Sequence, residues 1–196
     1  MKKPKKATYK PKPYEQMTYP GERVQVDVKV VPRKCIADPE MKLYQYTAID
    51  EYTRIRFLYG YEEQSTYSSA DFVKRLLKWY KRRGITVKCI QTDNGFEFTN
   101  RFSPSKRDKK TLFENTLSQL GIEHKLIRPY TPRHNGKVER SHREDHNKFY
   151  SCHRFYSCDD LNVQLAARLS RTNNRPMRPL KWFSPIEFLN NSVQYD

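Results

Sequence analysis

Glycine and cysteine are scarce in this chain, and long apolar runs are missing. The 196 residues include only six glycines and four cysteines. No stretch of about 18 apolar residues occurs, which excludes a transmembrane helix of ordinary length. The basic N-terminal stretch MKKPKKATYKPKP is not followed by an apolar segment, so it lacks the pattern of a secretory signal. These absences predict a protein that works away from membranes.

The cysteines are not spaced like those of a metal or redox site. None of them forms a CxxC pair, which argues against a zinc knuckle and against a thioredoxin-type motif. We expect free thiols in a reducing, cytoplasmic environment. The four residues are Cys35, Cys89, Cys152 and Cys158.

Acidic residues are few in comparison with basic ones. The sequence has 38 lysines and arginines against 22 aspartates and glutamates, a formal net charge of +16. This excess predicts a polyanionic partner, most simply nucleic acid. A merely basic soluble protein stays open as the alternative, because charge alone proves no binding. Residues 1–20 are rich in Lys, Pro and Tyr without periodicity and are predicted to form a flexible basic arm.

Hydrophobic periodicity predicts an α/β fold. Alternating or continuous apolar residues indicate five strands, at 23–31, 42–50, 54–63, 85–92 and 122–128. The first three are expected to form an antiparallel meander. Helices are expected to start, in chain order, at Ser68 or Ser69, at a capping box of Thr111 and Glu114, at about Lys137 and near Asp160, with a helical turn at PIEFL. This order predicts a mixed five-stranded sheet flanked by helices.

Three carboxylates differ from ordinary surface charges. Asp27 lies in the middle of a strand, where aspartate is disfavoured. Asp93 ends the fourth strand in TDNGFEF, and Glu139 lies in the first turns of a helix. Taken singly, each has a plain alternative. Asp27 could be solvated on an edge strand, Asp93 could be a turn former, and Glu139 could favour the helix dipole or pair with Arg143.

Together these carboxylates have the composition of a phosphoryl-transfer site. Carboxylate oxygen is the hard ligand that Mg²⁺ prefers. Two such ions about 3.5–4 Å apart can activate an attacking oxygen and stabilise a leaving one. A basic surface would then hold the phosphodiester backbone. The pattern therefore predicts metal-dependent chemistry on nucleic acid.

Four stretches carry a resemblance to a known family. They are VQVDVK (24–29), TDNGFEF (92–98), GIEHKLIRPYTPRHNGKVERSHR (121–143) and NNRPMRPLKWFSPIEFL (173–189). TDNG alone is weak evidence for any family, but TDNG followed in this order by P-x-x-P-x-x-N-G-x-x-E-R is a specific pattern. Over about residues 19–190 the sequence resembles the catalytic core of DDE transposases and retroviral-type integrases, most of all the bacterial insertion-sequence members.

The resemblance implies a ribonuclease-H-like fold and a catalytic role for Asp27, Asp93 and Glu139. These residues would bind two Mg²⁺ ions, for which Mn²⁺ can substitute. The implied reaction is hydrolysis at the 3′ ends of a mobile element, followed by attack of the freed 3′-OH on target DNA. The implied setting is a homo-oligomer on DNA in the bacterial cytoplasm. Residues 21–150 would form the integrase core, with the helix and tail of 151–196 packed on it.

The resemblance also implies DNA contacts beside the triad. The candidates are Asn94, Arg133, His134, Asn135, Lys137, Arg140, Arg143 and His146. Two departures from the family pattern stand out. The 45 residues between Asp93 and Glu139 exceed the usual gap, and the extra length is assigned to a basic loop at 100–111 that could touch DNA. In place of the usual N-terminal helix-turn-helix region there is only the basic arm, as in a core fragment, a truncated remnant or a subunit relying on another chain.

Three other readings stay open. HREDH (142–146) places His142 and His146 one turn apart as in helical zinc sites, but it lacks the Glu that follows the first His in HExxH. Both histidines are therefore expected to be exposed or to face DNA. A ribonuclease-H-type nuclease would share the fold and the metals. A truncated, non-catalytic DNA-binding remnant would share the basic surface.

Overall fold

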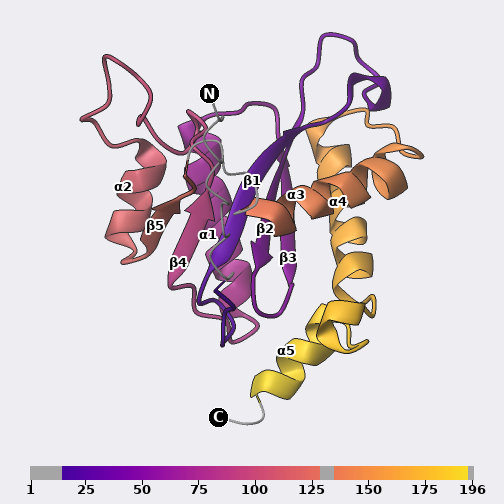
Figure 1. Cartoon of the computed structure of the whole chain (residues 1–196). Helices are drawn as coiled ribbons and strands as arrows, with labels where there is room; N and C mark the ends of the chain where they lie inside the picture. Colours follow the sequence, from indigo (N-terminus) through magenta and orange to yellow (C-terminus); the bar gives the residue numbers. More distant parts are fainter. Residues whose placement is uncertain (1–14, 129–134, 194–196) are drawn as a thin grey trace, which may run out of the picture.

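A five-stranded sheet forms the centre of the molecule (Figure 1). The structure is a computed structural model and describes residues 15–128 and 135–193. The strands lie in the order β3-β2-β1-β4-β5, and they are β1 (Val24–Val30), β2 (Tyr44–Asp50), β3 (Arg56–Tyr61), β4 (Cys89–Thr92) and β5 (Glu123–Leu126). β1, β2 and β3 pair antiparallel, whereas β4 pairs parallel with both β1 and β5. The predicted meander and the mixed five-stranded sheet are confirmed.

Strand β1 is central, with β2 on one side and β4 on the other. Its two faces are both covered, because Val24 and Val26 are fully buried and Gln25 between them is buried as well. The alternative that Asp27 lies solvated on an edge strand is therefore wrong. An aspartate on the central strand of a sheet needs partners that offset the cost of its burial.

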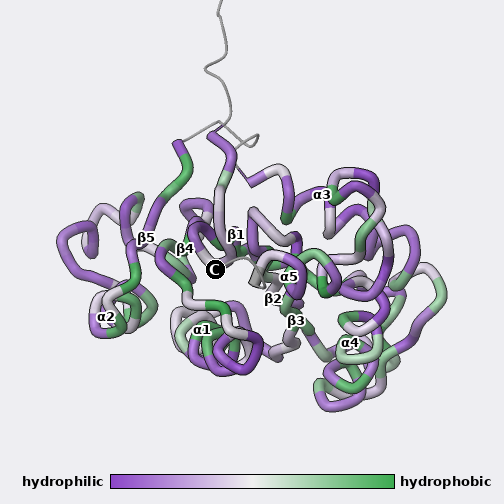
Figure 2. The backbone as a smooth tube through the Cα atoms, turned by 90° about the horizontal axis from the view of Figure 1, so that it is seen from below, coloured by the Kyte–Doolittle hydropathy of each residue, from purple (hydrophilic) through white to green (hydrophobic). Residues whose placement is uncertain are grey.

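Helices cover both faces of this sheet. They are α1 (Thr66–Lys81), α2 (Leu112–Gln119), α3 (Gly136–Asp145), α4 (Cys158–Asn173) and α5 (Pro185–Val193), with short 3₁₀ segments at Arg33–Cys35 and Arg178–Leu180. A π-helical turn, His146–Tyr150, continues α3. Figure 2 separates α1 and α2 on one side of the sheet from α3 on the other, and α4 packs against β3.

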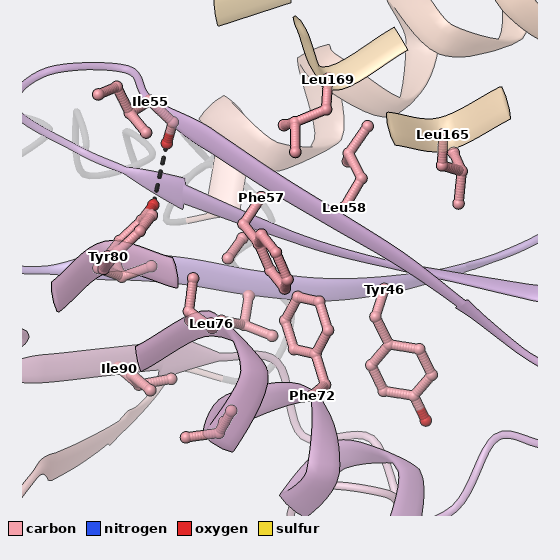
Figure 3. Packing of buried hydrophobic residues seen from close by; sticks show 14 of the residues in the cluster. Tyr46, Ile55, Phe57, Leu58, Phe72, Leu76, Tyr80, Ile90, Leu165 and Leu169 are labelled. Carbon is pink, nitrogen blue, oxygen red and sulfur yellow. Dashed lines mark hydrogen bonds between the residues drawn. The ribbon is translucent and has the colours of Figure 1, made fainter. Parts of the chain in front are cut away.

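Adjacent residues of β3 show how the layers are joined. The ring of Phe57 lies 5.5 Å from the ring of Phe72 in α1. The next side chain, Leu58, points the other way, toward Leu165 and Leu169 of α4 (Figure 3). This alternation is the ordinary two-residue period of a strand buried on both faces. All five residues belong to one hydrophobic core, so α4 is part of the same packed unit as the sheet.

The helix caps bear out one expectation and correct another. Thr111 and Glu114 form the predicted capping box of α2. Helix α1, however, is capped by Ser65, whose side chain accepts a hydrogen bond from the backbone N–H of Ser68. The expected caps Ser68 and Ser69 lie inside the first turn. Several serines in a row each have the chemistry of a cap, and packing decides which one is used.

The C-terminal helices begin earlier or run longer than the sequence predicted. Ser157 caps α4 through the backbone N–H of Asp160, so the helix starts at Cys158. The predicted turn at PIEFL is a helix of nine residues. None of the helices in the described ranges is long and apolar enough to span a bilayer. The four cysteines are free thiols, as predicted, and Cys35 and Cys89 are buried.

Candidate active site

The register between β1 and β4 brings Asp27 and Asp93 together. The two strands run parallel, with Gln25 opposite Gln91. Asp27 lies two residues beyond Gln25, and Asp93 lies two residues beyond Gln91, just after β4 ends at Thr92. Residues two apart on a strand share a face. The two aspartates therefore occupy corresponding positions on neighbouring segments, Asp27 within β1 and Asp93 directly after β4.

Asp93 takes part in a turn as well as in this pairing. Its Oδ1 accepts a hydrogen bond of 2.9 Å from the backbone N–H of Gly95. The amide of Asn94 donates to the carbonyl of Ile127, just past β5, at 3.1 Å. A side chain at Gly95 would place its Cβ 2.6 Å from a carboxylate oxygen of Glu97. Asp93 is thus a turn former, as the alternative proposed, and the same turn fixes where its carboxylate lies.

Helix α3 presents Glu139 and is held to the sheet at its start. The side-chain oxygen of Gln25 accepts hydrogen bonds from the backbone N–H groups of Lys137 and Val138, at 3.1 and 3.2 Å. These are among the N–H groups that a helix leaves without internal partners. The ammonium of Lys137 lies 2.7 Å from the buried carboxylate of Glu51. Glu139, which follows this anchored turn, is exposed.

The three carboxylates influence one another. Burial raises the pKa of Asp93, and the charge of Asp27 raises it further against the hydrogen bond from Gly95. Burial also raises the pKa of Glu139, as do the charges of Asp27 and, more weakly, Asp93. His142 and Arg143 oppose that shift. Like charges interact this way only when they are near each other. The charge of Asp27 thus acts on both Asp93 and Glu139, while the triad itself stays a prediction.

The carboxylates of Asp27, Asp93 and Glu139 are chemically suitable ligands for a divalent cation. All three groups are carboxylates, the hard oxygen ligands that Mg²⁺ favours. Burial and, to a smaller extent, the charge of Asp27 raise the pKa of Asp93 and Glu139, and a bound cation would oppose both effects. Within the described ranges, no three His, Cys, Asp or Glu side chains are already gathered tightly enough to hold a metal ion. Carboxylates that repel one another are expected to close around a cation only on binding it.

A fourth carboxylate, Glu97, lies near the site and is not among the residues that the sequence predicts for it. It is 3% exposed, and its Oε1 accepts a 2.6 Å hydrogen bond from the amide of Gln64. Its Oε2 is buried and has no hydrogen-bond partner among the described residues. Burial raises its pKa, and the charges of Asp93 and Asp27 add to the effect. Its position in TDNGFEF, four residues after Asp93, is the one sequence signal for it.

His142, the first histidine of HREDH, departs from the expectation for that motif. It was expected to be exposed or to face DNA, but it is only 8% exposed. Its Nε2 lies 3.0 Å from the hydroxyl of Thr47, and its Nδ1 lies 3.4 Å from Oδ2 of Asp27. His146, the other half of the HREDH pattern, is exposed in the π-helical turn. The two histidines therefore have different surroundings, which gives the zinc-site alternative no support.

The remaining predicted DNA contacts differ in accessibility and stay predictions. Arg140, Arg143 and His146 are exposed on α3 and the turn after it. The side chains of Asn94 and Lys137 are engaged within the protein, through the bonds to Ile127 and Glu51. Asn135 is 2% exposed at the start of α3, and its Oδ1 has no partner among the described residues. Arg133, His134 and the arm at residues 1–14 lie outside the described residues.

Comparison with known proteins decides the family. The sequence profile of the integrase core domain family matches residues 18–132, more than half of the chain. The chain belongs to the integrase core domain family. A second integrase core domain profile matches residues 120–185, across α3 and α4. Family members are polynucleotidyl transferases of mobile elements, in agreement with the predicted class.

Relatives of the integrase core family extend this result. The ORF3 protein of Spiroplasma virus SpV1-C74, named as an integrase, is 33% identical over 173 residues, covering 86% of this chain and 47% of the viral protein. A protein of Geobacillus stearothermophilus, named as the transposase for insertion sequence element IS5376, is 29% identical over 170 residues, covering 87% of this chain and 42% of its own length. The chain thus spans less than half the length of these curated relatives.

Solved integrase cores show the same fold. The catalytic core domain of BIV integrase superposes with a TM-score of 0.61 at 20% identity, covering 90% of this chain and 99% of that one. The HTLV-2 integrase catalytic core domain, solved in complex with magnesium, gives 0.58 at 18% identity, covering 87% and 97%. The fold is therefore ribonuclease-H-like, as the resemblance implied.

Proposed function

We propose that this integrase core cleaves DNA at the ends of a mobile element and transfers the freed strand to target DNA. Asp27, Asp93 and Glu139 form its metal-binding catalytic triad. The observation that carries the proposal is the parallel register of Gln25 and Gln91, because it sets Asp27, within β1, alongside Asp93, which directly follows the adjacent β4. The charge of Asp27, which helps to raise the pKa of both Asp93 and Glu139, supports it.

The cofactor is proposed to be two Mg²⁺ ions held by the three carboxylates, with Mn²⁺ able to substitute. Bound there, such ions activate the attacking oxygen and stabilise the leaving oxygen of a phosphodiester. The magnesium named for the HTLV-2 core supports this assignment by similarity of fold. The turn at Gly95 fixes Asp93, and the anchored first turn of α3 presents Glu139.

The partner is proposed to be DNA, both as element ends and as target. The net charge of +16 favours binding to a polyanion, and Arg140 and Arg143 are exposed next to Glu139. Pairing two DNA ends calls for a multimer in the bacterial cytoplasm. The basic loop at 100–111 lines an open surface hollow of about 260 Å³, where the four cations Arg101, Arg107, Lys109 and Lys110 outnumber the two acids Asp108 and Glu114.

The test is strand transfer with a matched pair of variants. Labelled duplexes copied from the DNA that flanks the coding sequence are incubated with a plasmid target and Mg²⁺ or Mn²⁺. Asp93→Asn should abolish joined products, whereas Asp159→Asn, an exposed aspartate on α4, should not. Activity that survives Asp93→Asn would refute the triad.

Further arms of the same assay separate the alternatives. Cleavage of an RNA–DNA hybrid without any strand transfer would favour a ribonuclease-H-type nuclease. DNA binding without cleavage of any end, in either metal, would favour the non-catalytic remnant.

A further inference from the structure

A buried row of polar side chains runs beneath α3 toward Asp27. It begins at Asp145, which is fully buried at the end of that helix. Both guanidinium nitrogens Nη1 and Nη2 of Arg56 donate to the Asp145 carboxylate, and Nε of Arg168 donates to it at 3.0 Å. The amide nitrogen of Gln45 also donates to it, at 3.0 Å. Burial alone would raise the pKa of Asp145, but these partners lower it.

The orientation of the Gln45 amide follows from these contacts. A carboxylate only accepts hydrogen bonds, so the group facing Asp145 must be the NH₂ of Gln45. The amide oxygen on the other side accepts the phenol O–H of Tyr150, in the π-helical turn. The same NH₂ donates to the hydroxyl oxygen of Thr47 at 2.9 Å. Gln45 is fully buried, so this arrangement is shielded from competing water.

The hydroxyl of Thr47 connects the Gln45 amide to the ring of His142. Its hydroxyl oxygen already accepts from Gln45, and its single proton is free for the Nε2 of His142 at 3.0 Å. On the other side of the ring, Nδ1 faces the Asp27 carboxylate, which again only accepts. Asp27 and Thr47 are directly opposite each other on β1 and β2. The imidazole thus lies between the two members of a cross-strand pair, and a proton on Nδ1 would satisfy the contacts on both sides of the ring.

We propose that His142 is a positioning residue for the first carboxylate of the triad. The Nδ1–H of His142 holds Oδ2 of Asp27, so that Oδ1 stays available to a metal ion shared with Asp93. The hydrogen bonds from Gln45 through Thr47 fix the tautomer that makes this possible. Outer partners of this kind orient metal ligands and are worth about 10–100-fold in metal affinity or activity. The inference rests on the proposed function, because it concerns the same metal site.

The tautomer is tested without metal or activity. The ¹⁵N shifts of the imidazole, assigned by comparison with His142→Asn, should show a protonated Nδ1 and an unprotonated Nε2 in the metal-free protein. Thr47→Val removes the donor to Nε2 and should weaken this preference, which Asp27 alone would then maintain. A proton found on Nε2 in the wild-type protein would overturn the proposal.

Metal binding is tested by calorimetry with Mn²⁺ on the metal-free chain. His142→Asn keeps an N–H group near the position of Nδ1 and should bind Mn²⁺ within a few-fold of wild type. His142→Gln places its amide near the position of Nε2, and both it and His142→Leu should bind about 10–100-fold more weakly. His153→Asn, outside the site, is the matched control and should leave binding unchanged. Thermal unfolding of each variant shows whether it is folded.

Asp93→Asn in the same titration distinguishes failure of the proposed function from failure of the proposed role of His142. If the wild-type chain binds no Mn²⁺, or if Asp93→Asn binds as tightly as wild type, the proposed function fails. If Asp93→Asn loses binding while folded His142→Leu and His142→Gln keep it, only the role of His142 is refuted. If His142 only filled space, asparagine and glutamine at this position should affect Mn²⁺ binding alike. Near wild-type binding in His142→Asn but not in His142→Gln would therefore show that the N–H group matters.

Discussion

Asp27 and Asp93 occupy equivalent positions on neighbouring parallel strands, each two residues beyond one partner of the Gln25–Gln91 pair. In sequence they are separated by 65 residues. Their proximity thus depends on the fold as a whole, and their role can be tested through groups that share the site or support it.

The first prediction concerns the triad itself. Asp27→Asn and Asp93→Asn should each lower the rate of metal-dependent strand cleavage by about 100-fold or more, since metal-assisted catalysis supplies several kcal/mol. In the metal-free protein the same changes remove repulsion and should not lower the melting temperature. Calorimetric unfolding and cleavage rates measured on the same samples check both parts. A folded variant that keeps its cleavage rate would contradict the assignment.

The second prediction concerns Glu97 and pH. Its pKa is raised by burial, so its ionisation in the folded state costs stability at neutral pH. Glu97→Gln should stabilise the metal-free chain by on the order of 1 kcal/mol, or roughly 2–4 °C in melting temperature. The cost appears as pH rises through the raised folded pKa and is absent below the unfolded pKa of about 4.3. The advantage of the variant should accordingly vanish in melts near pH 4.

The third prediction concerns the buried carboxylate of Asp145. Asp145→Asn leaves the guanidinium groups of Arg56 and Arg168 buried without their counterion, and should cost about 3–5 kcal/mol in urea unfolding. Because the folded pKa of Asp145 is lowered, its contribution is present above the unfolded pKa and is lost as pH falls through the folded one. The variant should therefore show a weaker loss of stability in acid than wild type. Equal acid sensitivity of the two proteins would count against this account.

The fourth prediction concerns DNA binding by α3. Replacing Arg140 and Arg143 by serine should weaken duplex binding and flatten the plot of log affinity against log salt by about 0.9 for each phosphate that the variant no longer neutralises. The paired control replaces Lys81 and Arg82, which are exposed at the end of α1 on the opposite side of the sheet. An equal weakening with the control pair would show that only net charge matters.

Much of this architecture could be predicted from the sequence because its signals are local or carried by a specific motif. The alternation in β1, the capping box at Thr111 and the turn after Asp93 each depend on neighbouring residues. The burial of His142 could not be predicted in this way. Helix α3 turns polar residues, among them Ser141, His142 and Asp145, toward the sheet. An apolar stripe is the usual sign of a buried helix face, and here the partners across the interface are polar as well.

The cap of α3 by Gln25 has a consequence for the accuracy of the site. β1 carries Asp27 directly, and through the side chain of Gln25 it also sets where the helix bearing Glu139 begins. A small displacement of β1 would therefore carry the first and third carboxylates along together and leave their separation nearly unchanged. Because β1 positions both Asp27 and Glu139, distortion elsewhere in the sheet should change the distance between these two carboxylates very little.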